Sequence, residues 1–117
     1  MKQDKVEKTI FFRVNKNLKN EFFDFCKRRG ISTSCVLRLF VLKFLDGSVK
    51  PQISTSNILY TGKNASMGFR VSADTYTKYV EKCRKLHVTV AGVFSNFMLN
   101  CIEQKQFPFD IYSMDAE

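Results

Sequence analysis

A pattern of 34 residues occurs twice in this chain, and this repeat limits the possible fold more than any other feature. Residues 12–45 align with residues 69–102 without a gap, at a constant offset of 57. Seven positions are identical, including a Phe-Arg-Val triplet, and most of the others keep their polar or apolar character. A short repeat that cannot bury its own apolar face must pack against a neighbour. The sequence therefore predicts two similar halves that share one core.

The charge of the chain is basic and unevenly distributed. Its 117 residues carry a net charge of +8, and 44% of them are hydrophobic, which suits one small globular unit. Residues 1–45 contribute +7, residues 66–102 contribute +3, and residues 103–117 are acidic with −3. This balance indicates a polyanionic partner.

Several classes of protein are not supported by the sequence. There is no apolar run of 18 residues, and the N-terminus has no apolar stretch typical of a signal peptide, so we expect a cytoplasmic protein without a membrane partner. The chain has one histidine, His87, and its four cysteines lack C-x-x-C spacing. We therefore expect buried thiols and no metal or other cofactor. The cysteines are Cys26, Cys35, Cys83 and Cys101.

Each half of the chain is predicted to form a strand followed by two helices. The strands, residues 9–14 and 66–71, are short and rich in β-forming residues. Because side chains alternate along a strand, one face carries Ile10, Phe12, Val14, Met67, Phe69 and Val71. The opposite face carries Thr9, Phe11, Arg13, Ser66, Gly68 and Arg70.

The helix boundaries are predicted from capping residues and apolar periodicity. Gly30 and His87 both suit the left-handed conformation that ends a helix. In the first half, we expect one helix from the N-cap Asn15 to Gly30 and a second from the N-cap Ser32 to Leu45. In the second half, the corresponding helices run from the N-cap Ser72 to His87 and from the N-cap Thr89 to Ile102.

Four segments follow from this pattern. Residues 1–45 form the first repeat with a basic N-terminal arm, residues 46–65 a linker, residues 66–102 the second repeat, and residues 103–117 an acidic tail. The tail carries apolar residues between Phe107 and Tyr112. They could dock on the shared core or contact a protein partner, and the sequence favours neither.

A strand ending in Arg-Val, a helix closed by glycine and a helix opened by serine together resemble the ribbon-helix-helix superfamily, which includes the Arc and MetJ type repressors. The resemblance covers residues 9–45 and 66–102, and two copies in one chain are similar to the arrangement in TraY of conjugative plasmids. It implies a mostly α fold with one short antiparallel β-ribbon, in which the tandem copies form an intramolecular pseudo-dimer. In that superfamily the ribbon enters the DNA major groove.

The resemblance also implies contacts with DNA. The expected base contacts are Thr9, Phe11, Arg13, Ser66, Gly68 and Arg70. Arginine can donate two hydrogen bonds to guanine, whereas Phe11 can make only apolar contact and Gly68 has no side chain. The expected phosphate contacts are Ser32, Thr33, Ser34, Thr89 and Val90 at the helix starts, and Lys2, Lys5 and Lys8 in the N-terminal arm.

Three functions are compatible with this reasoning. The first is sequence-specific binding of double-stranded DNA as a transcriptional repressor, with several copies side by side on repeated sites. The second is a relaxosome accessory protein that binds an origin of transfer during conjugation. The third is an antitoxin-like protein-interaction module. An enzyme is not expected, because the sequence has no carboxylate pair near the histidine, no glycine-rich phosphate loop and no nucleophile-base spacing.

Overall fold

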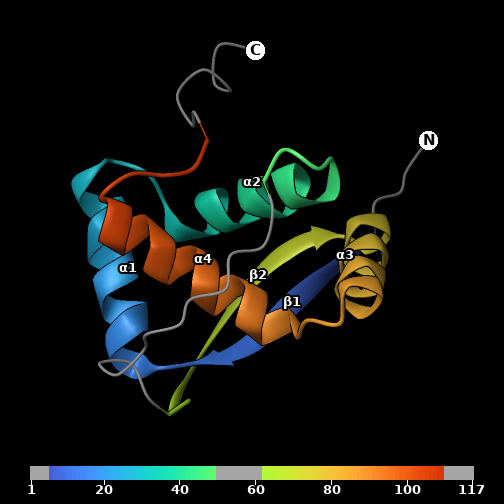
Figure 1. Ribbon diagram of the computed structural model, residues 1–117, viewed down its shortest axis with the longest axis horizontal. Coiled ribbons are helices and arrows are strands. Elements are labelled where there is room, and N and C mark those ends of the chain that lie inside the picture. The colour runs from blue at the N-terminus through green and yellow to red at the C-terminus, as the bar shows by residue number, and fades with distance from the viewer. Residues whose placement is uncertain (1–5, 50–61, 110–117) are drawn as a thin grey trace.

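The computed structural model describes residues 6–49 and 62–109 of the chain (Figure 1). In chain order the described elements are β1 (Glu7–Val14), α1 (Lys16–Arg28), α2 (Thr33–Leu45), β2 (Ala65–Ser72), α3 (Ala73–Leu86) and α4 (Val90–Gln104). The prediction of a mostly helical chain with one short two-stranded antiparallel sheet is confirmed. The strands are slightly longer than predicted, and α4 continues two residues beyond Ile102.

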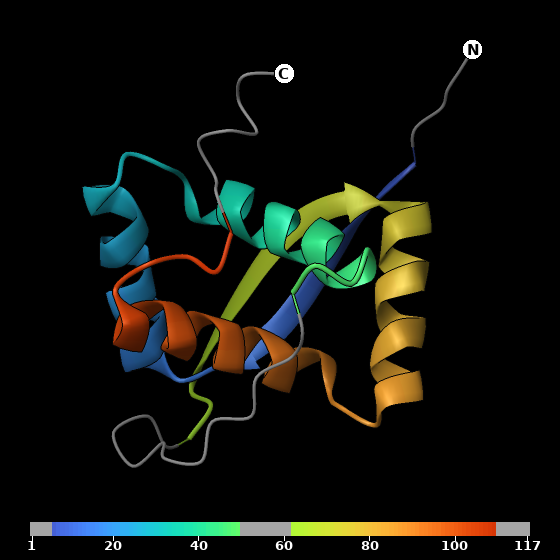
Figure 2. The same cartoon turned by 45° about the horizontal axis from the view of Figure 1, so that its top comes forward.

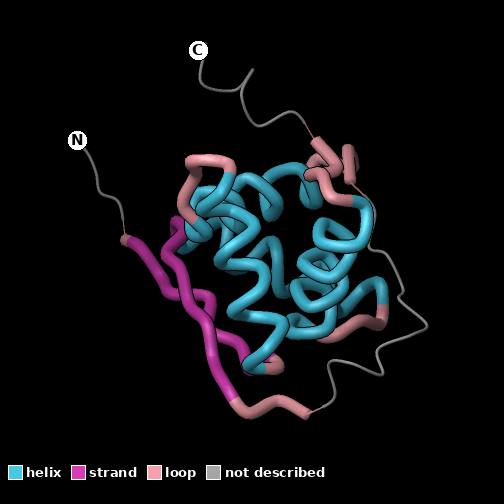
Figure 3. The backbone as a smooth tube through the Cα atoms, turned by 90° about the vertical axis from the view of Figure 1, so that its left-hand side faces the viewer, coloured by secondary structure: helices cyan, strands magenta, loops and turns pink. Residues whose placement is uncertain are grey.

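The two strands lie together on one side of the helices (Figure 3). Helices α2 and α4 lie between α1 and α3, with the ribbon behind them (Figure 2). The predicted alternation is confirmed, because Ile10, Phe12, Val14, Phe69 and Val71 are buried against the helices. Met67, on the same face, is half-buried against the same core. The ribbon therefore has one apolar face in the core and one face in solvent.

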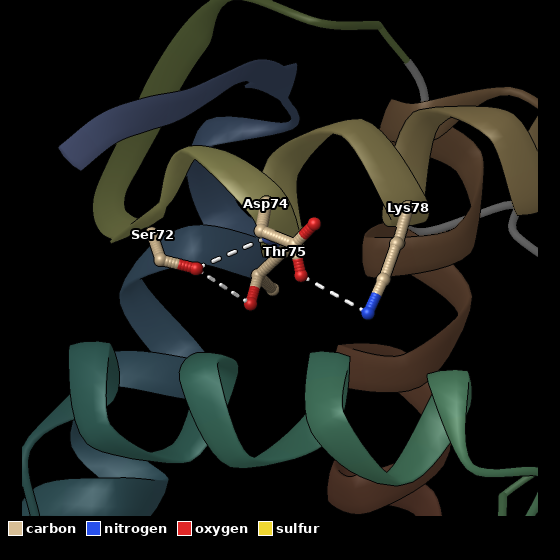
Figure 4. Close-up of polar contacts among 4 residues, drawn as sticks. All are labelled: Ser72, Asp74, Thr75 and Lys78. Atoms are coloured by element: carbon tan, nitrogen blue, oxygen red, sulfur yellow. Dashed lines mark hydrogen bonds and ion pairs between the residues drawn. The ribbon is translucent and has the colours of Figure 1, made fainter. Parts of the chain in front are cut away.

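The predicted N-caps are all confirmed by side-chain to backbone hydrogen bonds. The side-chain oxygen of each cap accepts a bond from the amide three residues ahead, at Asn15, Ser32, Ser72 and Thr89, over 2.9 to 3.1 Å. Figure 4 shows the start of α3, where Ser72 caps the helix and Asp74 pairs with Lys78 at 3.0 Å. These local bonds fix the points at which both strands turn into helices.

The first helix of each half ends in the predicted left-handed conformation. Gly30 has φ of 71° after α1, and His87 has φ of 59° after α3. Histidine is one of the few residue types with a side chain that adopt this conformation with some frequency. The single histidine therefore has a structural role at a helix end.

The core is built largely from aromatic rings contributed by both halves of the chain. Phe40 of α2 stacks on Phe97 of α4 with ring centroids 4.1 Å apart, and these two residues occupy the same position in the repeat. Phe94 packs against Phe12 from β1 at 4.6 Å and against Phe69 from β2 at 5.5 Å. The two halves thus bury their apolar faces against each other.

Each first helix lies beside the second helix of the other half, α1 against α4 and α3 against α2. Two surface grooves follow these contacts, and their linings correspond at the offset of 57. The first is lined by Glu21, Asp24, Phe25, Arg28, Arg29, Ile102 and Lys105. The second is lined by Lys78, Glu81, Lys82, Lys85, Leu86 and Leu45, which are the repeat counterparts of the first six.

The described part of the tail packs on the core. The Phe107 ring lies edge-on to Phe25 at 5.1 Å, and Phe109 stacks near Phe97 at 5.9 Å. Tyr112 lies outside the described residues. The two aromatic rings that sequence alone could not assign are therefore in contact with α1 and α4.

The thiols follow the prediction in three of four cases, since Cys26, Cys83 and Cys101 are buried and Cys35 is half-buried. Burial raises the pKa of the Cys26 thiol to about 11, against a smaller opposite effect of the Thr33 hydroxyl. Among residues 6–49 and 62–109, no three metal-ligating side chains cluster. No helix in the same residues is long and apolar enough to span a membrane.

Candidate functional site

The register of the ribbon brings the six predicted base-contact residues onto one outer face. Thr9 pairs with Arg70, Phe11 with Gly68, and Arg13 with Ser66. The offset of 57 that relates the two repeats also relates Phe11 to Gly68, Arg13 to Arg70 and Thr9 to Ser66. The outer face therefore shows a hydroxyl residue paired with an arginine at both ends and the Phe11–Gly68 pair at its centre.

Both arginines are exposed, and each contacts a neighbouring residue of the chain. Arg13 Nη2 donates to the Lys63 carbonyl oxygen at 2.8 Å. Arg70 Nη1 lies 3.6 Å from Glu7 Oε1, and these two side chains are 74% and 53% exposed. An ion pair this exposed contributes little, about 0–1 kcal/mol. The Arg70 guanidinium can therefore turn toward a ligand at small cost, whereas Arg13 would exchange an exposed hydrogen bond to Lys63 for a bond to the ligand.

The centre of the face is apolar. Phe11 is 67% exposed, and its ring lies over the backbone of Gly68. A Cβ atom at position 68 would stand 3.1 Å from Phe11 Cδ1 and 3.3 Å from Thr9 Cγ2. Because Gly68 has no side chain, the Phe11 ring and the Thr9 methyl group can lie close to its backbone. We call these two groups the central apolar spot.

The starts of α2 and α4 offer backbone amides more than hydroxyl groups. The Ser32 and Thr89 hydroxyls already accept capping hydrogen bonds, and Val90 has no polar side-chain atom. The Thr33 hydroxyl oxygen is buried beside the Cys26 thiol, so it does not face solvent. Ser34 is half-buried and lines a shallow groove with Phe23 and Lys27. By helix geometry the amides of the first turn lack an intrahelical acceptor, so a bound anion would meet amides there.

The predicted basic arm is described only in part. Lys8 belongs to β1, and its ammonium group lies 5.1 Å from the centroid of the Tyr76 ring, in cation–π contact. Lys8 is exposed, but by strand alternation it belongs to the helix side of the ribbon and not to its outer face. Lys2 and Lys5 lie outside the described residues.

Sequence reasoning missed the contacts that three lysines make at the end of the ribbon that carries Arg13, two through their backbone and one, Lys19, through its ammonium group. Lys63 accepts the bond from Arg13, the Lys19 ammonium group donates to the Ser66 carbonyl at 2.9 Å, and Lys16 donates its amide to Asn64 at 2.9 Å. The opposite end instead places Glu7 beside Arg70. The signal available in the sequence was the position of Lys16 and Lys19 in the first turn of the helix that follows the strand. The Lys19 ammonium group thus lies at one end of the ribbon and the Glu7 carboxylate at the other, although the arginines at the two ends correspond.

Comparisons of the chain with models of protein families, with curated proteins and with solved structures gave no match. A functional assignment therefore depends on the residues and geometry of the chain itself. The outer face offers two accessible guanidinium groups, hydroxyl groups and a central apolar spot, all on one face of a two-stranded ribbon. Such a surface can bind a polyanion and can distinguish hydrogen-bond acceptors from methyl groups.

Proposed function

We propose that the protein binds double-stranded DNA sequence-specifically through the outer face of the β1–β2 ribbon and acts as a transcriptional repressor. The observation that carries this proposal is the register, which puts Arg13 and Arg70 at opposite ends of one exposed face around the Phe11–Gly68 pair. The major groove of B-DNA is about 12 Å wide and admits a two-stranded ribbon. The apolar face of the ribbon is buried, so only the outer face is free to enter it.

We further propose that the two repeats form an intramolecular pseudo-dimer of the ribbon-helix-helix type. Corresponding residues of two halves face each other only where a twofold axis passes between them. Two such facing pairs, Phe11–Gly68 in the ribbon and Phe40–Phe97 in the core, support this proposal. The two corresponding grooves are a third sign of the same symmetry. One approximate axis through the ribbon and the core accounts for all three.

Base recognition would depend mainly on the two arginines. The strand pairs that contain Arg13 and Arg70 are four residues apart, about 13 Å along the ribbon. At a rise of about 3.4 Å per base pair this distance spans about four base pairs. Each guanidinium can donate to O6 and N7 of one guanine, so we expect two guanine contacts separated by that interval.

Phosphate binding would use charge and helix starts together. The net charge of +8 favours association with DNA, and the Lys19 ammonium group adds positive charge at the end of the ribbon that carries Arg13. The amides at the starts of α2 and α4 are suited to phosphate oxygens, because a helix N-terminus attracts anions. These contacts would position the ribbon without reading the sequence.

The test begins with selection of a binding site from a random duplex library. Affinities of the wild type, Arg13→Ala and Arg70→Ala for the selected duplex are then measured by fluorescence anisotropy. We expect each variant to lose about 1–3 kcal/mol, or about 5- to 150-fold in Kd, concentrated on one base position. Lys85→Ala removes the same charge from the groove between α2 and α3, and it should change the affinity less than twofold.

Circular dichroism shows whether the variants keep the fold. Wild-type affinity in both arginine variants, with the fold intact, would show that the outer face does not contact DNA. A footprint over a promoter, together with reduced reporter transcription, is expected for a repressor. A footprint beside a nick site would instead indicate a role in conjugative transfer.

A further inference from the structure

We infer that the central apolar spot recognises the C5-methyl group of one pyrimidine at the middle of the DNA site. This inference rests on the proposed binding of duplex DNA by the ribbon. It adds a specificity determinant that is independent of the arginines. In ordinary DNA the methyl group belongs to thymine, and in modified DNA it also occurs on 5-methylcytosine.

The first step concerns what Phe11 can contact. The ring is 67% exposed at the centre of an otherwise polar face, and it cannot donate a hydrogen bond to a base edge. In the major groove every base pair presents polar atoms, and among unmodified bases only thymine also presents a methyl group. A large exposed ring at this place therefore matches a methyl group and no other feature of the base edges.

The second step concerns the number of methyl groups. Both apolar groups of the spot, the Phe11 ring and the Thr9 methyl, come from β1, and Gly68 of β2 contributes only backbone. The ring leans over Gly68, within 3.1 Å of where a Cβ would stand. The apolar contact is thus made once and not in two symmetric copies. One methyl on one DNA strand satisfies it, which also gives the complex a preferred orientation.

The third step concerns position. The Phe11–Gly68 pair lies two residues from the pairs that contain Arg13 and Arg70. This is about 7 Å in each direction, or about two base pairs. The methyl-bearing pyrimidine should therefore lie midway between the two expected guanine contacts.

The experiment replaces each thymine of the selected duplex in turn with uracil, which removes only the methyl group. One central position should weaken binding by wild type about fourfold, the effect of one buried methyl-sized group. A 5-methylcytosine–guanine pair at that position should bind more tightly than a cytosine–guanine pair by a similar factor. The first comparison tests thymine as the source of the methyl group, and the second tests the modified base.

Two phenylalanine variants connect the effect to the central apolar spot. Phe11→Ala should bind the thymine and uracil duplexes equally, while Phe11→Leu should keep part of the preference because leucine is still apolar. Leu42→Ala is the matched control, since Leu42 is 52% exposed but lies near the end of α2, and it should keep the full preference. Unfolding midpoints of the three variants show whether the fold is kept.

The outcomes separate this inference from the proposed function. Tight, arginine-dependent binding without a uracil-sensitive central position would overturn the inference and leave the proposed function standing. The same holds if Phe11→Ala keeps the full preference for thymine. If no duplex is bound, both fail.

Discussion

The stack of Phe40 on Phe97 offers a direct test of whether the two halves share one core. The two rings come from corresponding positions of the repeat, are 2% and 3% exposed, and lie 4.1 Å apart. We consider Phe40→Leu, Phe97→Leu and the double variant. Leucine keeps most of the apolar volume, so the variants should remain folded while the ring stack is removed.

The expected magnitude follows from the contacts. Truncation of a buried phenylalanine to alanine costs about 3–5 kcal/mol, and leucine should limit the loss in the free energy of unfolding to about 1–2 kcal/mol for each variant. An aromatic pair contributes about 0.5–1.5 kcal/mol beyond its buried area. This pair term is lost in either single variant, so the double variant should lose less than the sum by that amount.

Urea unfolding followed by far-UV circular dichroism measures these values, since the chain has no tryptophan. The wild type and all variants should show one transition. Phe23→Leu, at a site 55% exposed, should change stability by less than about 0.5 kcal/mol. Two separate transitions, each altered by only one of the variants, would refute the shared core. Additive losses would refute the coupling between the rings.

Three further predictions concern assembly, charge and pH. Because both halves belong to one chain, the thermal midpoint should stay constant over a hundredfold dilution, and a marked fall would mean that two chains build the core. Glu7→Gln should tighten DNA binding at low salt by roughly two- to fivefold, since it removes a negative charge beside Arg70, and weaker binding would contradict this role. Burial raises the pKa of the Cys26 thiol from 9.0 to about 11, so the folded chain keeps a proton that the unfolded chain releases. The urea midpoint should be steady below about pH 9 and fall toward pH 11, Cys26→Ala should reduce that fall, and a flat profile in the wild type would contradict the assignment.

The sequence predicted the features that depend on neighbouring residues. Strand alternation assigned Ile10 and Arg13 to opposite faces, because the period of two leaves no other arrangement once one face is buried. Capping chemistry predicted Ser32 and Thr89 as N-caps, because a side-chain hydroxyl can accept a hydrogen bond from the free amide three residues ahead. The left-handed helix end at His87 follows from its alignment with Gly30. These are local rules, and the structure satisfies them.

Features that depend on packing were beyond the sequence. The Thr33 hydroxyl was expected at the surface, but the way α1 packs on α2 puts its oxygen beside Cys26. Lys19 approaches Ser66 although 47 residues separate them, because the ribbon brings the start of β2 to the end of β1. The tail showed apolar residues but no period, so its docking through Phe107 became visible only in three dimensions.

The proposed pseudo-dimer is formed within one chain, and this explains why the two residues paired at the centre of the ribbon can differ. In a symmetric dimer the residue at the axis meets its own copy, so a phenylalanine would have to share the central space with a second ring. A single chain removes this constraint, and Phe11 instead faces Gly68, which leaves room for one ring. The same freedom extends to the ends, where the Lys19 ammonium group lies at the Arg13 end while the Glu7 carboxylate adjoins Arg70. Apolar contact and charge are thus both unequal about the proposed axis, so a DNA site read by this face would be asymmetric and bound in one orientation.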